Sequence, residues 1–161
     1  MSWIRTKKRN INVKLLLPVF IASVLYCSII SAEGVLRLNV AGSASGQIDI
    51  RLNEKIAPAH VERIKVLTQE KKYDGVVFHR VIPGFMAQTG DVKFGNMKNF
   101  EPAFVGMGGS DYPMLKEEFS DDLFEKGTVG MARSRDPNSA NSQFFIMFER
   151  APHLDGKYTI I

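Results

Sequence analysis

The segment YDGVVFHRVIPGFMAQTGD, residues 73–91, constrains the fold of this 161-residue chain more than any other segment. It contains two short apolar runs on either side of Pro83 and Gly84, a dipeptide that marks a turn. Short apolar runs bounded by turn residues are typical of β-strands. Arg80 and Gln88 interrupt these runs, and such polar groups are costly to bury without partners. The two residues therefore need a structural or functional explanation.

Chain length and charge set the class of protein. A chain of this length, with 45% hydrophobic residues, suits one globular domain with its own core. The formal net charge is +4, but residues 1–32 contain five basic and no acidic residues. The remaining residues contain 16 basic and 17 acidic residues. Since nucleic-acid binding depends on basic residues that contact phosphates, no nucleic-acid partner is expected.

Residues 1–32 have the composition of a secretory signal peptide, with a basic start followed by an apolar run from Leu15 to Ile30. This run is shorter than the roughly 20 residues that span a bilayer. We therefore expect cleavage after Ala32 and a mature domain over residues 33–161. The alternative is an uncleaved anchor, which would make this segment the only contact with a membrane. Cys27, the only cysteine, lies here, so the mature domain is expected to contain no disulfide.

The rest of the chain reads as short strands with one helix. GVLRLNV and GQIDIRL are predicted strands around a Gly-Ser-rich turn, and GTVGMAR and SQFFIMF are two more. A helix is predicted from Pro58, with Val61, Ile64 and Leu67 on one face. No alternation of strand and helix of the βαβ kind is present. The pattern indicates a mostly antiparallel sheet or barrel.

Alternation along the strands places glutamines beside large apolar side chains. Met86 and Gln88 share one face of their strand, and Gln143 and Phe145 share one face of theirs. Together with Arg80, these residues suit a shallow pocket for an extended, uncharged peptide. An equally weighted alternative is that Arg80 pairs with a carboxylate and the glutamines satisfy loop backbone.

The histidines, the serines and one acidic run show no pattern typical of a metal site or of nucleophilic catalysis. His60, His79 and His153 have no metal-ligand spacing, so neither a metal nor a cofactor is expected. The serines lack a nucleophile signature. The acidic run EEFSDDLFE, residues 117–125, is interpreted as a solvated surface.

Five motifs, in order, resemble those of the cyclophilins, the peptidyl-prolyl cis/trans isomerases: FHRVIPGFMAQTGD, GMGGS, GTVGMARS, NSQFFI and HLDGKYT. The resemblance covers roughly residues 34–160 and implies a mostly β fold, a closed antiparallel β-barrel with a capping helix. The segment around VGMGGSD and LKEEF is similar to the bacterial, exported type. It implies a periplasmic, monomeric enzyme that acts on proline-containing segments of client proteins.

The resemblance also implies a role for each site residue. Arg80 would be the catalytic arginine, hydrogen-bonding the prolyl nitrogen as the amide twists, and Gln88 its neighbouring amide. The other implied substrate-binding residues line the proline pocket and the groove: Phe85, Met86, Ala132, Arg133, Gln143, Phe145, His153, Leu154 and Tyr158.

Three positions depart from the family pattern. His153 stands where well-known members carry a tryptophan that contacts cyclosporin, so we expect weak cyclosporin binding. Tyr158 stands where a groove histidine is common. Family members also continue past KYT with closing strands and a second helix, which implies that the domain here is incomplete at its C-terminus. The alternatives to an isomerase are therefore a proline-peptide holdase with little turnover, or a non-functional fragment.

Overall fold

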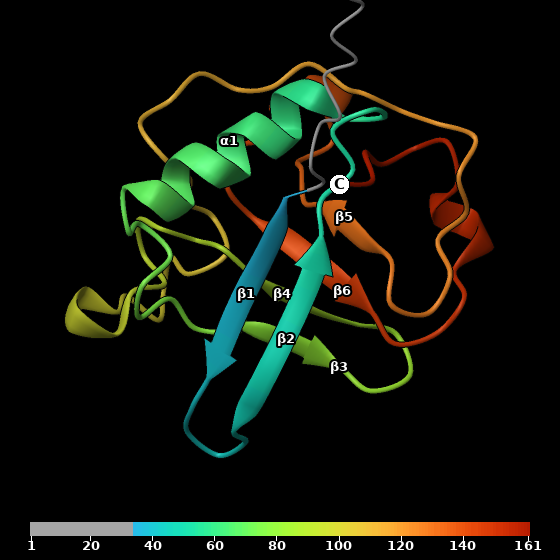
Figure 1. The fold of residues 1–161 in the computed structure, drawn as a ribbon. Coiled ribbons are helices and arrows are strands. Elements are labelled where there is room, and N and C mark those ends of the chain that lie inside the picture. Colours follow the sequence, from blue (N-terminus) through green and yellow to red (C-terminus); the bar gives the residue numbers. More distant parts are fainter. Residues whose placement is uncertain (1–33) are drawn as a thin grey trace, which may run out of the picture. The chain divides into compact units, whose positions relative to one another are not determined.

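The computed structural model describes residues 34–161, and the predicted signal segment lies outside them. Within this range one α-helix, α1 (Pro58–Gln69), accompanies six strands and three short 3-10 helices (Figure 1). None of the helices in residues 34–161 is long and apolar enough to cross a membrane. The strands are β1 (Val35–Val40), β2 (Gly46–Arg51), β3 (Arg80–Ile82), β4 (Met86–Thr89), β5 (Val129–Met131) and β6 (Phe144–Met147); the 3-10 helices are η1 (Met97–Asn99), η2 (Pro137–Ser139) and η3 (Pro152–Leu154).

The strands form two antiparallel sheets. β1 and β2 make a hairpin in which Val35 lies opposite Arg51, and the second sheet has the order β3-β4-β6-β5. All of the ladders are antiparallel, as the alternating pattern and the lack of βαβ units predicted. Closure of the two sheets into one barrel stays a prediction.

The helix α1 begins and packs as its sequence predicts. Pro58 occupies its first turn, and Val61, Ile64 and Leu67 are fully buried. The side chain of Glu118 accepts hydrogen bonds from the N–H groups of Ala59 and His60, each at 3.1 Å. These two N–H groups have no partner within the helix, so the carboxylate satisfies both of them.

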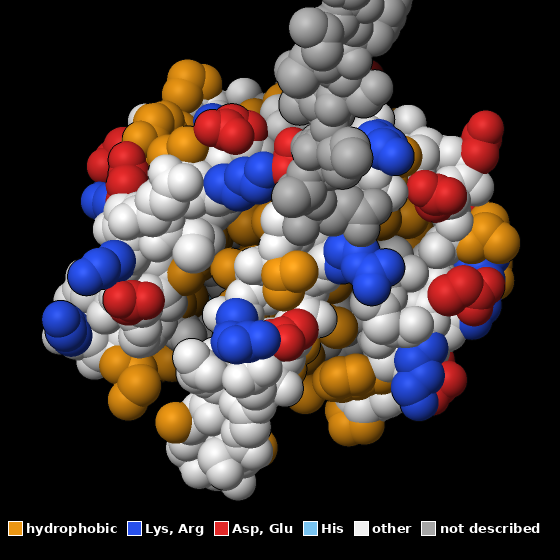
Figure 2. All heavy atoms as spheres, in the orientation of Figure 1, with side chains coloured by type: hydrophobic (Ala, Val, Ile, Leu, Met, Phe, Trp, Pro, Cys, Tyr) orange, Lys and Arg blue, Asp and Glu red, His pale blue; other side chains and the backbone are white. Residues whose placement is uncertain are grey.

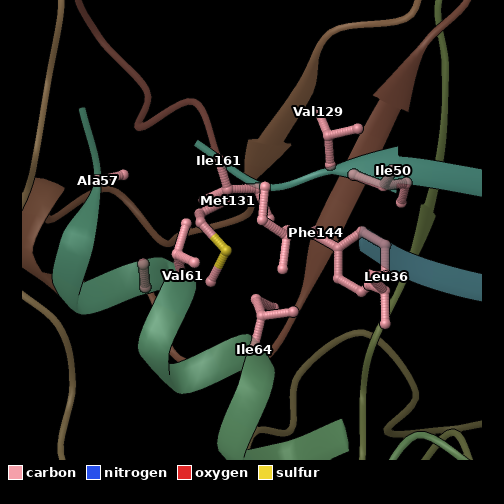
Figure 3. Packing of buried hydrophobic residues seen from close by; sticks show 11 residues of the cluster. Leu36, Ile50, Ala57, Val61, Ile64, Val129, Met131, Phe144 and Ile161 are labelled. Carbon is pink, nitrogen blue, oxygen red and sulfur yellow. The ribbon is translucent and has the colours of Figure 1, made fainter. Parts of the chain in front are cut away.

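The main core lies between α1, the β1–β2 hairpin and the second sheet. Side chains from all three meet there, among them Leu36, Ile50, Ile64, Met131 and Phe144 (Figure 3). Burial of large apolar side chains of this kind stabilises the fold by about 1.5–3 kcal/mol each. The core therefore holds the second sheet, on which the candidate site lies, against the helix and the hairpin.

One face of the surface carries charges of both signs. On the side that shows the hairpin, Lys and Arg side chains are interspersed with Asp and Glu side chains, and apolar groups lie between them (Figure 2). This face shows no large area of positive charge of the kind that nucleic-acid binding requires.

Candidate active site

The β3–β4 hairpin sets the position of Arg80. The turn between the strands has Gly84 at a φ of +72°, and the N–H of Phe85 donates to the carbonyl of Ile82 at 3.0 Å. A positive φ is easily adopted only by glycine. The register then places Arg80 directly opposite Gln88, so their side chains share one face.

Arg80 makes a polar contact with its cross-strand neighbour. Its Nη1 donates to Oε1 of Gln88 at 3.4 Å, and the side chain is exposed. Among residues 34–161, Arg80 takes part in no ion pair with a carboxylate. The guanidinium therefore has most of its donors available on an open surface, which weighs against the carboxylate-pairing alternative.

Two glutamine amides continue from Arg80 to a distant loop. Gln88 Nε2 donates to Gln143 Oε1 at 2.9 Å. Gln143 Nε2 in turn donates to the carbonyl oxygens of Gly106 and Gly108, at 3.0 and 2.7 Å. The expectation that a glutamine satisfies loop backbone is thus met by Gln143, in the same arrangement that links it to Arg80.

The side chains predicted to form the proline pocket pack together beside these amides. Met86 is 2% exposed, Phe145 6% and Leu154 7%, and all three belong to one cluster of packed side chains. The partly buried Phe85, Ala132 and Tyr158 pack against the same cluster. At its edge the rings of Phe85 and His153 lie 5.7 Å apart, tilted by 30°. The structure therefore brings the predicted pocket residues together, beside the amides and Arg80.

The cluster of the predicted pocket also contains an aromatic residue, Phe124, that was not predicted from the sequence. Phe124 is fully buried, and its ring stacks on that of Phe145 at 5.8 Å. The ring of Tyr158 meets both of them edge-on, at 6.5 and 5.8 Å. Phe124 lies in the acidic run that was interpreted as solvated, and that interpretation is wrong for this position. The sequence offered one signal, the presence of apolar side chains, Phe119, Leu123 and Phe124, within this acidic run.

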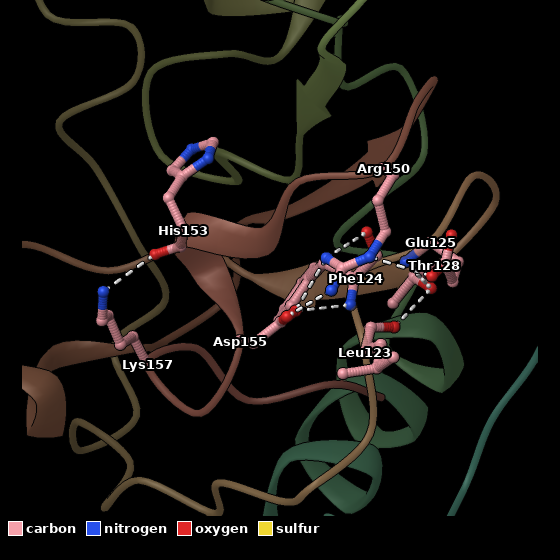
Figure 4. Close-up of polar contacts among 8 residues, drawn as sticks. All are labelled: Leu123, Phe124, Glu125, Thr128, Arg150, His153, Asp155 and Lys157. Atoms are coloured by element: carbon pink, nitrogen blue, oxygen red, sulfur yellow. Dashed lines mark hydrogen bonds and ion pairs between the residues drawn. The ribbon is translucent and has the colours of Figure 1, made fainter.

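An ion-pair network fixes the backbone at Phe124 (Figure 4). Asp155 accepts from the N–H of Phe124 at 2.9 Å and from two nitrogens of Arg150, at 3.1 and 2.5 Å. Arg150 also pairs with Glu125 at 2.9 Å. The hydrogen bonds from Arg150 hold the pKa of Asp155 below its usual value. The network therefore anchors the residue on which the pocket ring rests.

Arg133 binds a neighbouring segment through its side chain. Its guanidinium lies 4.2 Å from the ring centre of Tyr158 and donates to the carbonyl oxygen of Lys157 through two nitrogens, at 3.2 and 2.6 Å. The backbone of Arg133 makes no hydrogen bond with the main chain of residues 34–161. Those main-chain groups are therefore available to an extended peptide, while the side chain holds Tyr158 in place.

A groove with a mixed apolar and polar lining lies elsewhere on the molecule. It has a volume of about 730 Å³ and is lined by β2 and by residues that include Asp122, Leu123, Glu125, Val129, Ile146 and Ile160. None of the predicted site residues lines it. The groove is therefore distinct from the candidate site.

Comparison with known proteins gives the family. The family model described as cyclophilin type peptidyl-prolyl cis-trans isomerase/CLD matches residues 35–161. Probable peptidyl-prolyl cis-trans isomerases of Brucella suis biovar 1 (strain 1330) and Brucella abortus (strain 2308) are each 62% identical over 117 residues. The match covers 72% of this chain and 60% of each relative, so the chain spans less than two thirds of their length.

Solved structures agree with the fold. The cyclophilin AquaCyp293 from Hirschia baltica is 28% identical, with a TM-score of 0.58, and the match covers 71% of this chain and 58% of that one. A Cryptosporidium parvum cyclophilin type peptidyl-prolyl cis-trans isomerase, crystallised in the presence of the dipeptide Ala-Pro, is 28% identical, with a TM-score of 0.61 and coverage of 71% and 70%. The ordered motifs, the strands with one helix and these matches lead to one conclusion: the chain belongs to the cyclophilin-type peptidyl-prolyl cis-trans isomerase family.

Proposed function

We propose that this protein is a peptidyl-prolyl cis-trans isomerase that accelerates X–Pro rotation in client proteins. One observation supports the proposal: the guanidinium of Arg80, contacted by Gln88, lies exposed on the sheet that also contains the apolar side chains of Met86 and Phe145. The pocket would hold the proline ring, and the guanidinium would act on the adjoining amide.

The chemistry that this arrangement suits is rotation without bond breakage. The barrier to rotation about a peptide bond is about 18–20 kcal/mol, because amide resonance is lost in the twisted state. The prolyl nitrogen becomes pyramidal there and gains a lone pair. A hydrogen bond from Arg80 to this nitrogen is stronger in the twisted state than in the planar one, and such a difference lowers the barrier.

The substrate would be an extended segment that contains proline. The second N–H of the Gln88 amide, which Gln143 holds in place, and the main chain of Arg133 offer hydrogen bonds to its backbone. The crystallisation of the Cryptosporidium parvum relative in the presence of Ala-Pro supports this substrate class. We propose that the enzyme acts as a monomer on client proteins in the periplasm, with residues 1–32 as its export signal or, alternatively, its anchor.

The first prediction tests the role of Arg80. We expect Arg80→Ala to slow isomerisation of a short X–Pro peptide on the order of 10²-fold, the cost of one transition-state donor. The measurement is NMR exchange spectroscopy on the peptide with the protein at catalytic concentration. The domain should stay folded, because this side chain is exposed and forms no ion pair within residues 34–161.

The matched control is Arg37→Ala, which removes an exposed arginine of the β1–β2 hairpin that pairs with Asp49 at 2.8 Å. It should leave the rate unchanged. A rate for Arg80→Ala close to that of wild type would refute the assignment. Peptide binding of equal affinity in wild type and variant, with no rate enhancement in either, would instead identify a holdase.

A further inference from the structure

Asp91 is a buried carboxylate whose charge is met by main-chain groups. It follows β4 and is 0% exposed. Its Oδ1 accepts from the N–H groups of Lys93 and Phe94, at 3.1 and 2.9 Å. Its Oδ2 accepts from those of Gly106 and Gly108, at 2.7 and 3.0 Å. A carboxylate that receives several backbone N–H bonds is held in one orientation by them.

The loop that Asp91 binds is held from two sides at the same residues. Gly106 and Gly108 give their N–H groups to Asp91 and their carbonyl oxygens to Nε2 of Gln143. No side chain fits at Gly108, since a Cβ atom there would lie 2.4 Å from Asp91 Oδ1. Asp91 therefore sets where these two carbonyl oxygens point.

Those carbonyl oxygens fix the direction of both glutamine amides. A carbonyl can only accept, so Gln143 must present its Nε2 to the loop and its Oε1 to Gln88. Gln88 must then present Nε2 to Gln143, which leaves its own Oε1 facing Arg80. In a glutamine amide only the oxygen can accept from a guanidinium, so this order of donors gives Arg80 an acceptor. The opposite order would place an N–H group against it.

We propose that Asp91 is a positioning residue for the isomerisation, acting through the Gly106–Gly108 turn and the two glutamine amides on the orientation of Arg80. The inference rests on the proposed function, but its physical core, the dependence of the Arg80 side chain on Asp91, does not require turnover. Asp91 is fully buried, so it acts solely through the arrangement of its neighbours.

Asp91→Asn tests the proposal with a side chain of nearly equal volume. The amide would direct an NH₂ group at two backbone N–H groups, so two of the four hydrogen bonds that Asp91 accepts would be lost. We expect turnover of an X–Pro peptide to fall about tenfold, with KM changed by less than twofold. The guanidinium Nε–Hε signal of Arg80 should move in a ¹H–¹⁵N spectrum. Asp111→Asn, an exposed aspartate of the same region, is the control and should change neither quantity.

A double-mutant cycle separates positioning from loss of stability. In an Arg80→Ala background, Asp91→Asn should cause no further loss of turnover, because its effect passes through Arg80. A purely structural role would reduce turnover by the same factor in both backgrounds, and this outcome would overturn the proposal. An unchanged Arg80 signal in a folded Asp91→Asn protein would also overturn it.

A second variant covers the case in which Asp91→Asn does not fold. Gln143→Met removes the link between the turn and Gln88 and leaves the bonds of Asp91 in place. The Arg80 signal should then shift, and no shift would refute the proposal. Should wild type show no turnover, the proposed function fails, but the Arg80 signal still decides whether Asp91 orients this side chain.

Discussion

Gly130, in β5, lies where a side chain would collide with the rings of the predicted pocket. A Cβ atom there would stand 2.6 Å from ring atoms of both Phe124 and Phe145. We expect Gly130→Ala to push Phe145 into the space for the proline ring. The change should destabilise the domain by about 1–3 kcal/mol, as overpacking does, and raise KM more than it lowers turnover.

Thermal unfolding and peptide kinetics measure the two effects of Gly130→Ala. The companion variant Phe124→Leu frees space beneath residue 130, so it should restore the KM of the alanine protein at least in part. Wild-type kinetics in Gly130→Ala alone would show that the rings adjust without cost to the pocket.

His79 makes stability depend on pH near neutrality. It lies half-buried beside Arg80, and burial lowers its pKa below 6.5, while the carboxylate of Asp91 opposes the shift and Arg80 adds to it. The unfolded chain then binds a proton that the folded protein does not. Stability from this residue is therefore complete above the unfolded pKa and decreases as the pH falls below about 6.5.

The prediction for His79 is a loss of melting temperature between pH 7.5 and 5.5 that His79→Gln reduces. His153→Gln, at an exposed histidine, is the comparison variant. Superimposable profiles for wild type and His79→Gln would disprove the idea.

At the scale of elements, the first turn of α1 depends on Glu118. Burial raises the pKa of this carboxyl, but hydrogen bonds from the His60 ring and from the N–H groups of Ala59 and His60 outweigh it and lower the pKa overall. We expect Glu118→Ala to reduce the free energy of unfolding by about 1–2 kcal/mol through loss of this cap. The same stability is lost in wild type as the pH falls through the lowered pKa.

Chemical denaturation at pH 7 measures the effect of Glu118→Ala. Glu62→Ala serves as its control, because this glutamate is exposed on α1 and an exposed substitution changes stability by about 0.5 kcal/mol or less. Equal midpoints for the two variants would show that α1 starts without help from Glu118.

The type and the buried face of most helices and strands could be predicted from local sequence patterns. The segments against which each of them packs could not. The helix face of Val61, Ile64 and Leu67 followed from its spacing, and the hairpin at residues 34–52 from its turn. The run before Arg80 was expected to continue as strand, yet β3 contains only three residues. The reason is a contact across the chain, since Val77 donates to the carbonyl of Gly95 in the long loop.

For the candidate site, the residues within strands could also be predicted from the sequence, and those in loops could not. Alternation predicted that Met86 lies with Gln88 and Gln143 with Phe145, because a strand repeats every two residues. It gave no sign of Asp91 or Phe124, since their roles come from loops that approach from 15 or more residues away. Packing between distant segments leaves little trace in local spacing.

At the scale of the whole molecule, the candidate site lies apart from many of the core residues that stabilise the fold. Substitutions in that part of the core should therefore lower stability without changing turnover. The predicted site residues lie on or after β3, and none belongs to the β1–β2 hairpin or to α1. Leu36 of β1 is 5% exposed in the main core, so Leu36→Ala should cost about 2–5 kcal/mol. Turnover per folded molecule, measured well below the melting temperature, should stay at the wild-type value. A loss of turnover in fully folded Leu36→Ala would link the hairpin to catalysis.

The groove beside β2 has a consequence for handling the protein. Apolar side chains lie open to solvent in this groove, and Leu123 in its lining is 50% exposed. Exposed apolar surface of this kind favours association between molecules. Solubility will therefore limit the working concentration, and turbidity will rise with concentration before catalysis is affected.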